Sequence, residues 1–241
     1  MRRLFVPGER IGGGLARLTA PDLHYLRQVL RLQPGATLEV FDGQGGIFDA
    51  RLEGGDALVL GARREAPPPL ACVHLAFALA RGERCDLLVQ KATELGVARL
   101  VPFEAARSVV RLGGARGAER ARRWQRIAVE AARQSGRGDV PTVDAPGPLE
   151  AALASCPGSF RKLLFYEGGG EPVASAVDRS APGHLAVIGP EGGLAPEEVE
   201  ICLRAGARLV TLGPRVLRFE TAGMVAAALL QHLLGDLGQD L

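Results

Sequence analysis

Three glycine-rich segments in the last third of the chain carry residue types that could bind a small ligand through exposed main chain. Each follows a short apolar run: 167–170 reads Glu-Gly-Gly-Gly, 189–193 reads Gly-Pro-Glu-Gly-Gly, and 213–221 reads Gly-Pro-Arg-Val-Leu-Arg-Phe-Glu-Thr. Glycine permits a positive φ and a close approach of backbone N–H and C=O groups to a ligand. Together the segments predict a site for a small polar and aromatic molecule, although each one alone is also ordinary turn chemistry.

Other ligand-binding patterns do not occur in the sequence. The 189–193 segment lacks the G-x-G-x-x-G spacing of dinucleotide sites, and no G-x-x-x-x-G-K-[ST] phosphate loop is present. The cysteines and histidines show no metal-ligand spacing and no Cys–His pairing, so neither a zinc site nor a disulfide framework is expected. They are Cys72, Cys85, Cys156, Cys202, His24, His74, His184 and His232. Cys72 and Cys202 lie in apolar runs and are expected to be buried.

Positive charge is concentrated in the middle of the chain. Ten arginines against three glutamates fall between residues 99 and 137, although the whole chain has a net charge of only +2. A stretch this basic attracts phosphate backbones, such as those of nucleic acids. For any single arginine, a solvated surface charge is the alternative. No signal peptide and no run of eighteen apolar residues is recognised, so we expect a cytoplasmic protein.

A helix and several short strands are predicted in the first seventy residues. Thr19 can cap a helix whose first turn contains Pro21 and Asp22. Apolar residues then repeat at helical spacing, namely Leu23, Leu26, Val29 and Leu30, and the helix ends at 33–35 (Gln-Pro-Gly). Apolar runs over 37–41, 46–52 and 57–60, separated by turn residues, predict strands of a small barrel. Three prolines at 67–69 mark the domain boundary.

Strands and helices alternate from residue 71 onward. Helices are predicted over 86–95, ending before Gly96, and over 118–135. The predicted strands are 73–79, 97–103, 162–166, 185–188 and 208–212. This alternation is typical of a parallel sheet covered by helices on both faces, in which ligands bind at the carboxyl ends of the strands.

Three ordered motifs resemble those of the RsmE family, SPOUT-class methyltransferases that modify N3 of a uridine in 16S ribosomal RNA. The motifs are 91–97 (Lys-Ala-Thr-Glu-Leu-Gly-Val), 188–193 (Ile-Gly-Pro-Glu-Gly-Gly) and 212–222 (Leu-Gly-Pro-Arg-Val-Leu-Arg-Phe-Glu-Thr-Ala). Segments 26–31 and 134–137 are also similar, so the resemblance covers nearly the whole chain. The sequence departs from the family at Phe219, where a small Thr is usual, and at Ala106 and Arg133, where acids are common.

The resemblance implies an α/β fold of two domains. Residues 1–68 would form a PUA-like RNA-binding β-barrel, and 71–241 a SPOUT methyltransferase domain whose parallel sheet contains a deep trefoil knot. It also implies S-adenosylmethionine as cofactor, no metal, a homodimer, and 16S rRNA of the small ribosomal subunit as partner. The apolar helix predicted over 222–234 would pack in the core or at the dimer interface.

The resemblance places the cofactor among the three glycine-rich loops. The implied cofactor-binding residues are Leu164, Phe165, Tyr166, Glu167, Ile188, Gly189, Pro190, Glu191, Gly192, Gly193, Leu212, Gly213, Arg215, Val216, Leu217, Arg218, Thr221 and Ala222. RNA contacts are expected from the basic stretch, the first helix and segment 134–137: Arg27, Arg31, Arg107, Arg111, Arg116, Arg120, Arg123, Gln134 and Arg137.

Methyl transfer to uridine N3 needs a group that favours the deprotonated base. An arginine near a uracil oxygen stabilises the developing anion, and Arg218 is the first candidate, followed by Arg107 and Arg137. Glu220 is the candidate general base, or an orienter of Arg218; a capping acid of the last helix is its alternative role. Glu191 is expected to hydrogen-bond the cofactor or the backbone, and Glu94 to pair with a nearby arginine.

Alternative functions follow from the same residues. A knotted ribose 2′-O-methyltransferase would use the same loops, and a non-catalytic RNA-binding module would keep only the basic surface. The glycines at 189, 192, 193 and 213 argue against the second alternative. A nucleotide hydrolase is disfavoured because the phosphate loop and metal carboxylates are missing.

Overall fold

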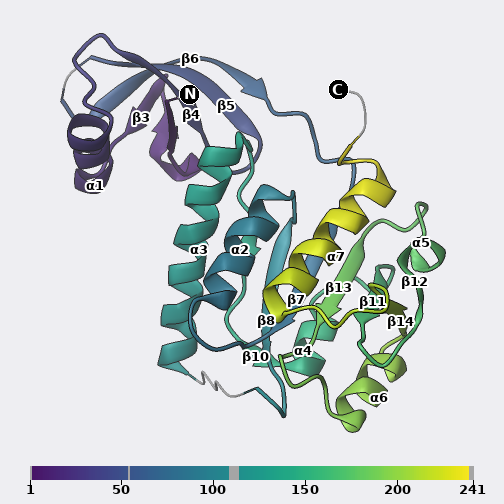
Figure 1. The fold of residues 1–241 in the computed structure, drawn as a ribbon. Coiled ribbons are helices and arrows are strands. Elements are labelled where there is room, and N and C mark those ends of the chain that lie inside the picture. The colour runs from purple at the N-terminus through teal and green to yellow at the C-terminus, as the bar shows by residue number, and fades with distance from the viewer. Residues whose placement is uncertain (1, 54, 109–113, 239–241) are drawn as a thin grey trace. The chain divides into compact units, whose positions relative to one another are not determined.

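The computed structural model describes residues 2–53, 55–108 and 114–238. The chain divides into two compact units: Met1–Pro68 with Val129–Val140, and Pro69–Ala128 with Pro141–Leu241. The long helix α3 (Ala115–Ser135) therefore begins in the second unit and ends in the first (Figure 1). The sequence gives no sign that α3 is divided between the two units, because arginines are spread along the whole helix.

The first unit contains a six-stranded mixed sheet with strand order β1-β4-β5-β6-β3-β2. β1 pairs with β4 in parallel, and the other pairs are antiparallel. The strands are β1 (Arg3–Phe5), β2 (Ile11–Gly12), β3 (Leu15–Arg17), β4 (Thr37–Phe41), β5 (Gly46–Leu52) and β6 (Ala57–Glu65). The predictions over 37–41 and 46–52 are confirmed; the strand predicted over 57–60 continues to Glu65.

The predicted helix after Thr19 is present, but it ends at Val29 rather than at 33–35, and its second half is not α-helical. Thr19 and Asp22 form a capping box: the Thr19 N–H donates to Asp22 Oδ2 (2.8 Å) and the Asp22 N–H to Thr19 Oγ1 (3.4 Å). α1 (Ala20–His24) then widens into the π-helical turn η2 (Tyr25–Val29). The wider turn rotates Val29 away from the core, which leaves it 59% exposed where helical spacing predicted burial.

A buried arginine ties the end of α3 to this sheet. Arg3 is only 4% exposed, and its Nε donates to Glu39 Oε1 at 2.6 Å. Its guanidinium also donates to the carbonyl oxygens of Ala132 (3.4 Å) and Arg137 (3.1 Å), and lies 4.7 Å from the centre of the Phe41 ring. A cation suits the negative end of a helix. The contacts explain why residues 129–140 belong to the first unit.

The second unit is built on a parallel sheet with order β10-β8-β7-β13-β11-β14-β12, and β9 also pairs with β8. The strands are β7 (Val73–Ala78), β8 (Arg99–Glu104), β9 (Thr142–Val143), β10 (Gly147–Pro148), β11 (Arg161–Phe165), β12 (Glu171–Pro172), β13 (His184–Ile188) and β14 (Ala207–Thr211). All five strands predicted for this region are present, each within two residues of its predicted ends.

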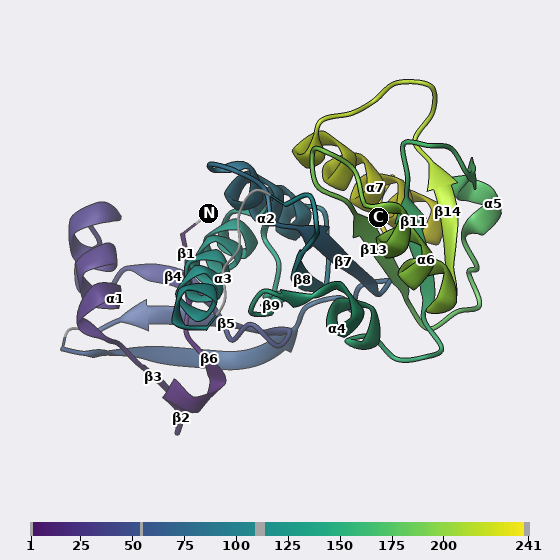
Figure 2. The same ribbon diagram turned by 90° about the horizontal axis from the view of Figure 1, so that it is seen from below.

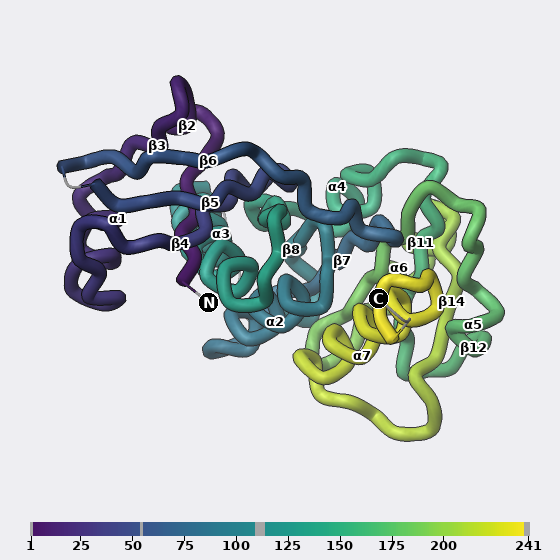
Figure 3. The backbone as a smooth tube through the Cα atoms, turned by 90° about the horizontal axis from the view of Figure 1, so that it is seen from above, coloured from purple at the N-terminus to yellow at the C-terminus, as the bar shows by residue number. Residues whose placement is uncertain are grey.

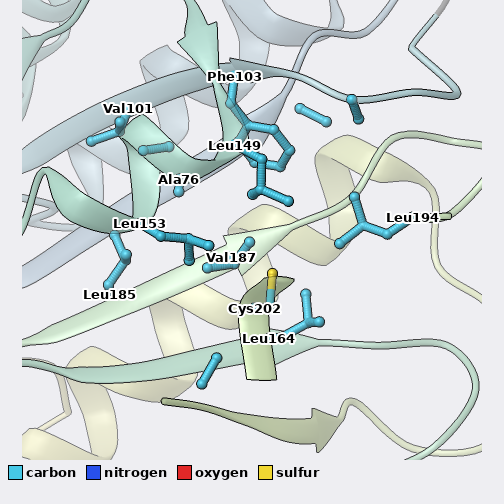
Figure 4. Packing of buried hydrophobic residues seen from close by; sticks show 14 of the residues in the cluster. Ala76, Val101, Phe103, Leu149, Leu153, Leu164, Leu185, Val187, Leu194 and Cys202 are labelled. Carbon is cyan, nitrogen blue, oxygen red and sulfur yellow. The ribbon is translucent and has the colours of Figure 1, made fainter. Parts of the chain in front are cut away.

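Helices cover both faces of the parallel sheet (Figures 1 and 2). They are α2 (Arg84–Glu94), α3, α4 (Leu149–Ala154), α5 (Val173–Ala176), α6 (Pro196–Arg204) and α7 (Phe219–Leu234). On one face, apolar side chains of α4 and α6 pack against the strands, as Figure 4 shows for Leu153, Cys202 and Val187. On the other face, Phe77 packs edge-on against Trp124 of α3 and Phe219 of α7.

The helix predicted over 86–95 corresponds to α2, and Gly96 follows it with a φ of +84° as expected of a residue just past a helix end. Gly96 also makes room for α7, because a Cβ at this position would lie 2.7 Å from Gln231 Nε2. The helix predicted over 118–135 corresponds to α3. The apolar helix predicted over 222–234 corresponds to α7, which buries Ala226, Ala227 and Leu230.

Candidate active site

The three glycine-rich segments meet because their strands are neighbours in the sheet. β11 lies between β13 and β14, and all three run in parallel. Their carboxyl ends therefore lie at one edge, where the segments after Phe165, Ile188 and Thr211 leave the sheet. Figure 3 shows the segment between β14 and α7 as a wide yellow-green loop. The sequence predicted the loops but not that β11, the first of these strands, lies in the middle.

A pocket opens between these loops. Thirteen of the predicted cofactor residues line it: Phe165, Tyr166, Glu167, Ile188, Gly189, Pro190, Glu191, Leu212, Gly213, Arg215, Val216, Leu217 and Ala222. Thr211, Pro214 and Phe219 line it as well and were not predicted. Phe219 was noted only as a departure from the family; its ring also packs on Phe77 with centroids 6.3 Å apart.

Five predicted cofactor residues do not line the pocket: Leu164, Gly192, Gly193, Arg218 and Thr221. The Leu164 side chain is fully buried in the cluster beneath α4 and α6 (Figure 4). Alternation along a strand explains this, because neighbouring side chains point to opposite faces of the sheet.

Three glycines in these loops have a positive φ, a conformation that other residues adopt only with strain: Gly169 (+106°), Gly193 and Gly213. Gly193 has a φ of +69°, donates its N–H to the Pro190 carbonyl oxygen (2.9 Å), and lies against the Glu167 carboxylate. Gly213 has a φ of +103° and donates its N–H to Thr211 Oγ1 (3.1 Å). Non-glycine residues rarely adopt positive φ, so the loop shapes depend on these three positions.

Two arginines hold the 189–193 loop from the side of β7 and β8. Arg84, the first residue of α2, forms an ion pair with Glu191. Arg107, which follows β8, donates from Nη1 to the Gly192 carbonyl oxygen at 3.0 Å. The sequence did not indicate the Arg84 contact, since the two partners are 107 residues apart. Glu94 pairs with Lys91 (2.8 Å), so the expectation that it pairs with an arginine is wrong.

Arg218 and Glu220, two of the catalytic candidates, lie at the start of α7. Arg218 is exposed at the N-cap position and makes no side-chain capping hydrogen bond. Glu220 lies in the first turn, and its buried Oε2 has no hydrogen-bond partner within the described part of the chain. The position suits an acid near a positive helix end, and the unpaired oxygen could accept a proton. Both roles considered for Glu220 fit this geometry.

The basic residues predicted to contact RNA lie in both units. In the second unit, Arg116 is exposed, Arg120 lies 5.7 Å from the Trp124 ring centre, and Arg123 donates to Asp86 Oδ2 from Nε (3.0 Å) and Nη2 (2.5 Å). Arg111 lies outside the described residues. Asp86 also accepts from Trp124 Nε1 (2.8 Å), so it orients two neighbouring side chains of α3.

The first unit contains the other four RNA candidates. Arg27 donates to the Gly55 carbonyl oxygen (3.1 Å), and Arg137 pairs with Asp139 (2.6 Å). Arg31 and Gln134 are exposed, and Arg31 has a φ of +53°. The RNA contacts of these four residues stay predictions.

Among the described residues, the titratable groups away from the loops form no metal centre. Burial raises the pKa of the Cys85 and Cys202 thiols to about 11, which keeps both protonated at neutral pH. Cys72 is only half-buried and its Sγ lies 3.7 Å from His74 Nε2, so the expectations of a buried Cys72 and of no Cys–His pair are wrong. Residues 2–53, 55–108 and 114–238 contain no cluster of three potential metal ligands, and none of their helices could span a membrane.

Comparison with known families matches both units of the chain. An RNA methyltransferase domain matches residues 66–231, and an RNA methyltransferase PUA domain matches residues 18–60. The ribosomal RNA small subunit methyltransferase E of Mycobacterium bovis is 33% identical over 89% of this chain and 85% of its own length. Its counterpart from Synechocystis sp. is 34% identical over 96% of this chain and 78% of its own length.

Solved structures agree with the sequence comparison. A ribosomal RNA small subunit methyltransferase E from Neisseria gonorrhoeae, bound to S-adenosyl methionine, superposes with a TM-score of 0.86 at 31% identity, covering 97% of this chain and 98% of its own. A Legionella pneumophila methyltransferase in complex with the same cofactor gives a TM-score of 0.86 at 29% identity, covering 95% and 96%. The chain therefore belongs to the ribosomal RNA small subunit methyltransferase E family.

Proposed function

We propose that this protein transfers a methyl group from S-adenosylmethionine to N3 of a uridine in the 16S rRNA of the small ribosomal subunit. The observation that carries the proposal is the pocket at the ends of β13, β11 and β14, in a chain that aligns over 97% of its length with a relative bound to S-adenosyl methionine. The curated relatives support ribosomal RNA as substrate.

The residues of the pocket fit such a cofactor. Ile188, Leu212 and Leu217 offer apolar surface for an adenine ring, and the main chain of the loops offers donors and acceptors for its edge. The carboxylates of Glu167 and Glu191 suit a ligand that carries positive charge. When bound, S-adenosylmethionine supplies a methyl group activated by its sulfonium sulfur. The thirteen predicted residues that line the pocket are the proposed cofactor-lining residues, and Thr211, Pro214 and Phe219 join them. Leu164, Gly192, Gly193, Arg218 and Thr221 stay predictions from the resemblance.

The protein's own residues must align the acceptor base and remove its N3 proton. Arg218 is proposed to stabilise the negative charge that develops on the uracil oxygens, with Arg107 in a supporting role. Glu220 is proposed to accept the N3 proton, or to orient Arg218. The unpaired Glu220 oxygen and the exposed position of Arg218 support these roles. The predicted arginines, with Gln134, would hold the RNA backbone in register.

Further parts of the proposal follow from the family. The protein is proposed to act as a cytoplasmic homodimer, and its second unit to contain a deep trefoil knot. Light scattering coupled to size-exclusion chromatography tests the dimer, since a monomer at working concentration contradicts it.

The decisive experiment is a nucleoside analysis of the product. Purified protein is incubated with S-adenosylmethionine and either free small-subunit rRNA or assembled subunits, and the RNA is digested and analysed by mass spectrometry. New 3-methyluridine is expected, while a 2′-O-methylated nucleoside would assign the protein to ribose chemistry. Binding of RNA without any methylated product would support the non-catalytic alternative.

A further inference from the structure

One wall of the pocket is held by two arginines, Arg84 and Arg107, that do not themselves line the pocket. Glu191 lines the pocket, and its carboxylate is paired with Arg84 at the start of α2. Next to it, Arg107 binds the carbonyl oxygen of Gly192. Arg84 follows β7 and Arg107 follows β8, which are the next two strands beyond β13 in the sheet. Two successive residues of the 189–193 loop, Glu191 and Gly192, are therefore each bound by an arginine from outside the loop.

The position of Arg84 is not explained by the stability of its own helix. Arg84 is the first residue of α2, where the helix dipole disfavours a cation. Glu191 neutralises this charge from outside the helix, because its carboxylate is the ion-pair partner of the Arg84 guanidinium. A residue placed against the preference of its helix, and paired with a side chain that lines the pocket, points to a role toward the loop.

We propose that Arg84 is a positioning residue for the methyl-transfer site: through its ion pair with Glu191 it holds the 189–193 loop in the shape that receives the cofactor. The inference rests on the proposed function, which identifies the ligand as S-adenosylmethionine. The side chains of Arg84 and Glu191 are 45% and 31% exposed, so solvent screens the pair and its effect is modest. Loss of the pair is expected to weaken cofactor binding about two- to fivefold.

A double-mutant cycle separates an action through Glu191 from a direct one. The dissociation constant of S-adenosylmethionine is measured by calorimetry for wild type, Arg84→Ala, Glu191→Gln and the double variant, without RNA. If Arg84 acts through Glu191, Arg84→Ala weakens binding in the wild-type background and has no further effect in the Glu191→Gln background. Equal effects in both backgrounds would overturn the proposal. Arg84→Lys is expected to recover most of the affinity, because it keeps the charge.

An exposed arginine in the segment between β7 and α2 provides the matched control. Arg81 precedes α2 by three residues, and Arg81→Ala is expected to leave cofactor affinity unchanged. If Arg84 only contacts RNA, Arg84→Ala would raise the KM for rRNA and leave the cofactor dissociation constant at its wild-type value. That result would also overturn the proposal.

A second measurement needs neither cofactor nor RNA. The Gly193 N–H is hydrogen-bonded to the Pro190 carbonyl oxygen within the loop, so its hydrogen exchange reports on the loop's conformation. Arg84→Ala is expected to accelerate exchange at Gly193 in the cofactor-free protein, and Arg81→Ala is not. Unchanged exchange in Arg84→Ala refutes the positioning role. If wild-type protein binds no S-adenosylmethionine, the proposed function fails, yet this measurement still reports on the ion pair.

Discussion

Substitution of single loop glycines by alanine should distinguish the backbone positions on which the pocket depends. Gly193 has a φ of +69°, and a methyl group added there would fall on the Glu167 carboxylate. Gly192, its neighbour, does not have a positive φ, and an added Cβ would make an ordinary contact of 3.6 Å with Arg107 Cβ. The two adjacent variants thus differ in strain while adding the same single carbon to the same loop.

The expected magnitude follows from the cost of a left-handed conformation. A non-glycine residue pays roughly 1–2 kcal/mol there, before any cost of moving Glu167. If the loop of the variant relaxes in the free protein to relieve this strain, cofactor binding must return the loop to its strained shape. The strain energy is then subtracted from the free energy of binding. Gly193→Ala should then weaken S-adenosylmethionine binding about five- to thirtyfold. Gly192→Ala should stay within about twofold of wild type, because its native backbone is compatible with alanine.

Calorimetric titration of both variants with S-adenosylmethionine provides the assay, and thermal unfolding confirms that each variant is folded. Gly213→Ala is a third variant: Gly213 has a φ of +103°, and no protein atom lies within 4 Å of an added Cβ. It should also weaken binding, although no side chain is displaced. Equal losses in Gly192→Ala and Gly193→Ala would refute the reasoning, since strain at one position would then not be the cause.

Three further predictions concern catalysis and stability. Arg218→Ala should abolish methylation and leave cofactor affinity nearly intact, because Arg218 does not line the pocket; loss of both in calorimetry and activity assays would make it a structural residue. Arg3→Met should lower the free energy of unfolding in urea by about 3–5 kcal/mol by leaving Glu39 buried without Arg3, and the Arg3→Met/Glu39→Met double variant should recover much of it. Burial lowers the pKa of His184 below its ordinary value of 6.5, so the unfolded chain binds protons more readily and the free energy of unfolding should fall as pH drops below about 6.5. His184→Gln should flatten this part of the pH profile, whereas an unchanged slope would assign it to other groups.

A hydrogen bond to the His184 ring also favours its neutral form. The His184 Nε2 accepts from the Asp178 N–H at 3.2 Å, which requires an unprotonated nitrogen. The Asp178 carboxylate favours protonation of the ring and the Arg161 guanidinium opposes it, so the burial of His184 decides the direction of the shift in its pKa.

Much of the second unit could be predicted from sequence because its signals are local and repeated. Strands such as β7 and β13 are apolar runs apart from His74 and His184, and each of the loops after β11, β13 and β14 contains glycine. In the first unit, β1, β2 and β3 have only two or three residues, too few for an alternating pattern to be visible. The π-helical turn at 25–29 also escaped prediction, since Leu26 and Val29 are equally apolar in sequence.

The candidate site shows the same division between local and long-range information. The lining role of Gly189 or Leu217 follows from a motif, and the exclusion of Leu164 follows from the alternation of side chains along β11. The contact of Arg84 with Glu191 depends on which strands are neighbours in the sheet, and a parallel order that places β11 between β13 and β14 is not encoded in any one segment. Sequence alone therefore identified the loops better than the residues that support them.

The course of α3 limits how this protein could be dissected or shuffled. A fragment that ends at Pro68 would lack residues 129–140, and Arg3 would lose the carbonyl oxygens of Ala132 and Arg137 that it binds in the intact chain. The Arg3 guanidinium would then lack two of its hydrogen-bond acceptors in the truncated unit. A fusion that exchanges the amino-terminal unit at the proline boundary must therefore include residues 129–140, because they belong to the same compact unit.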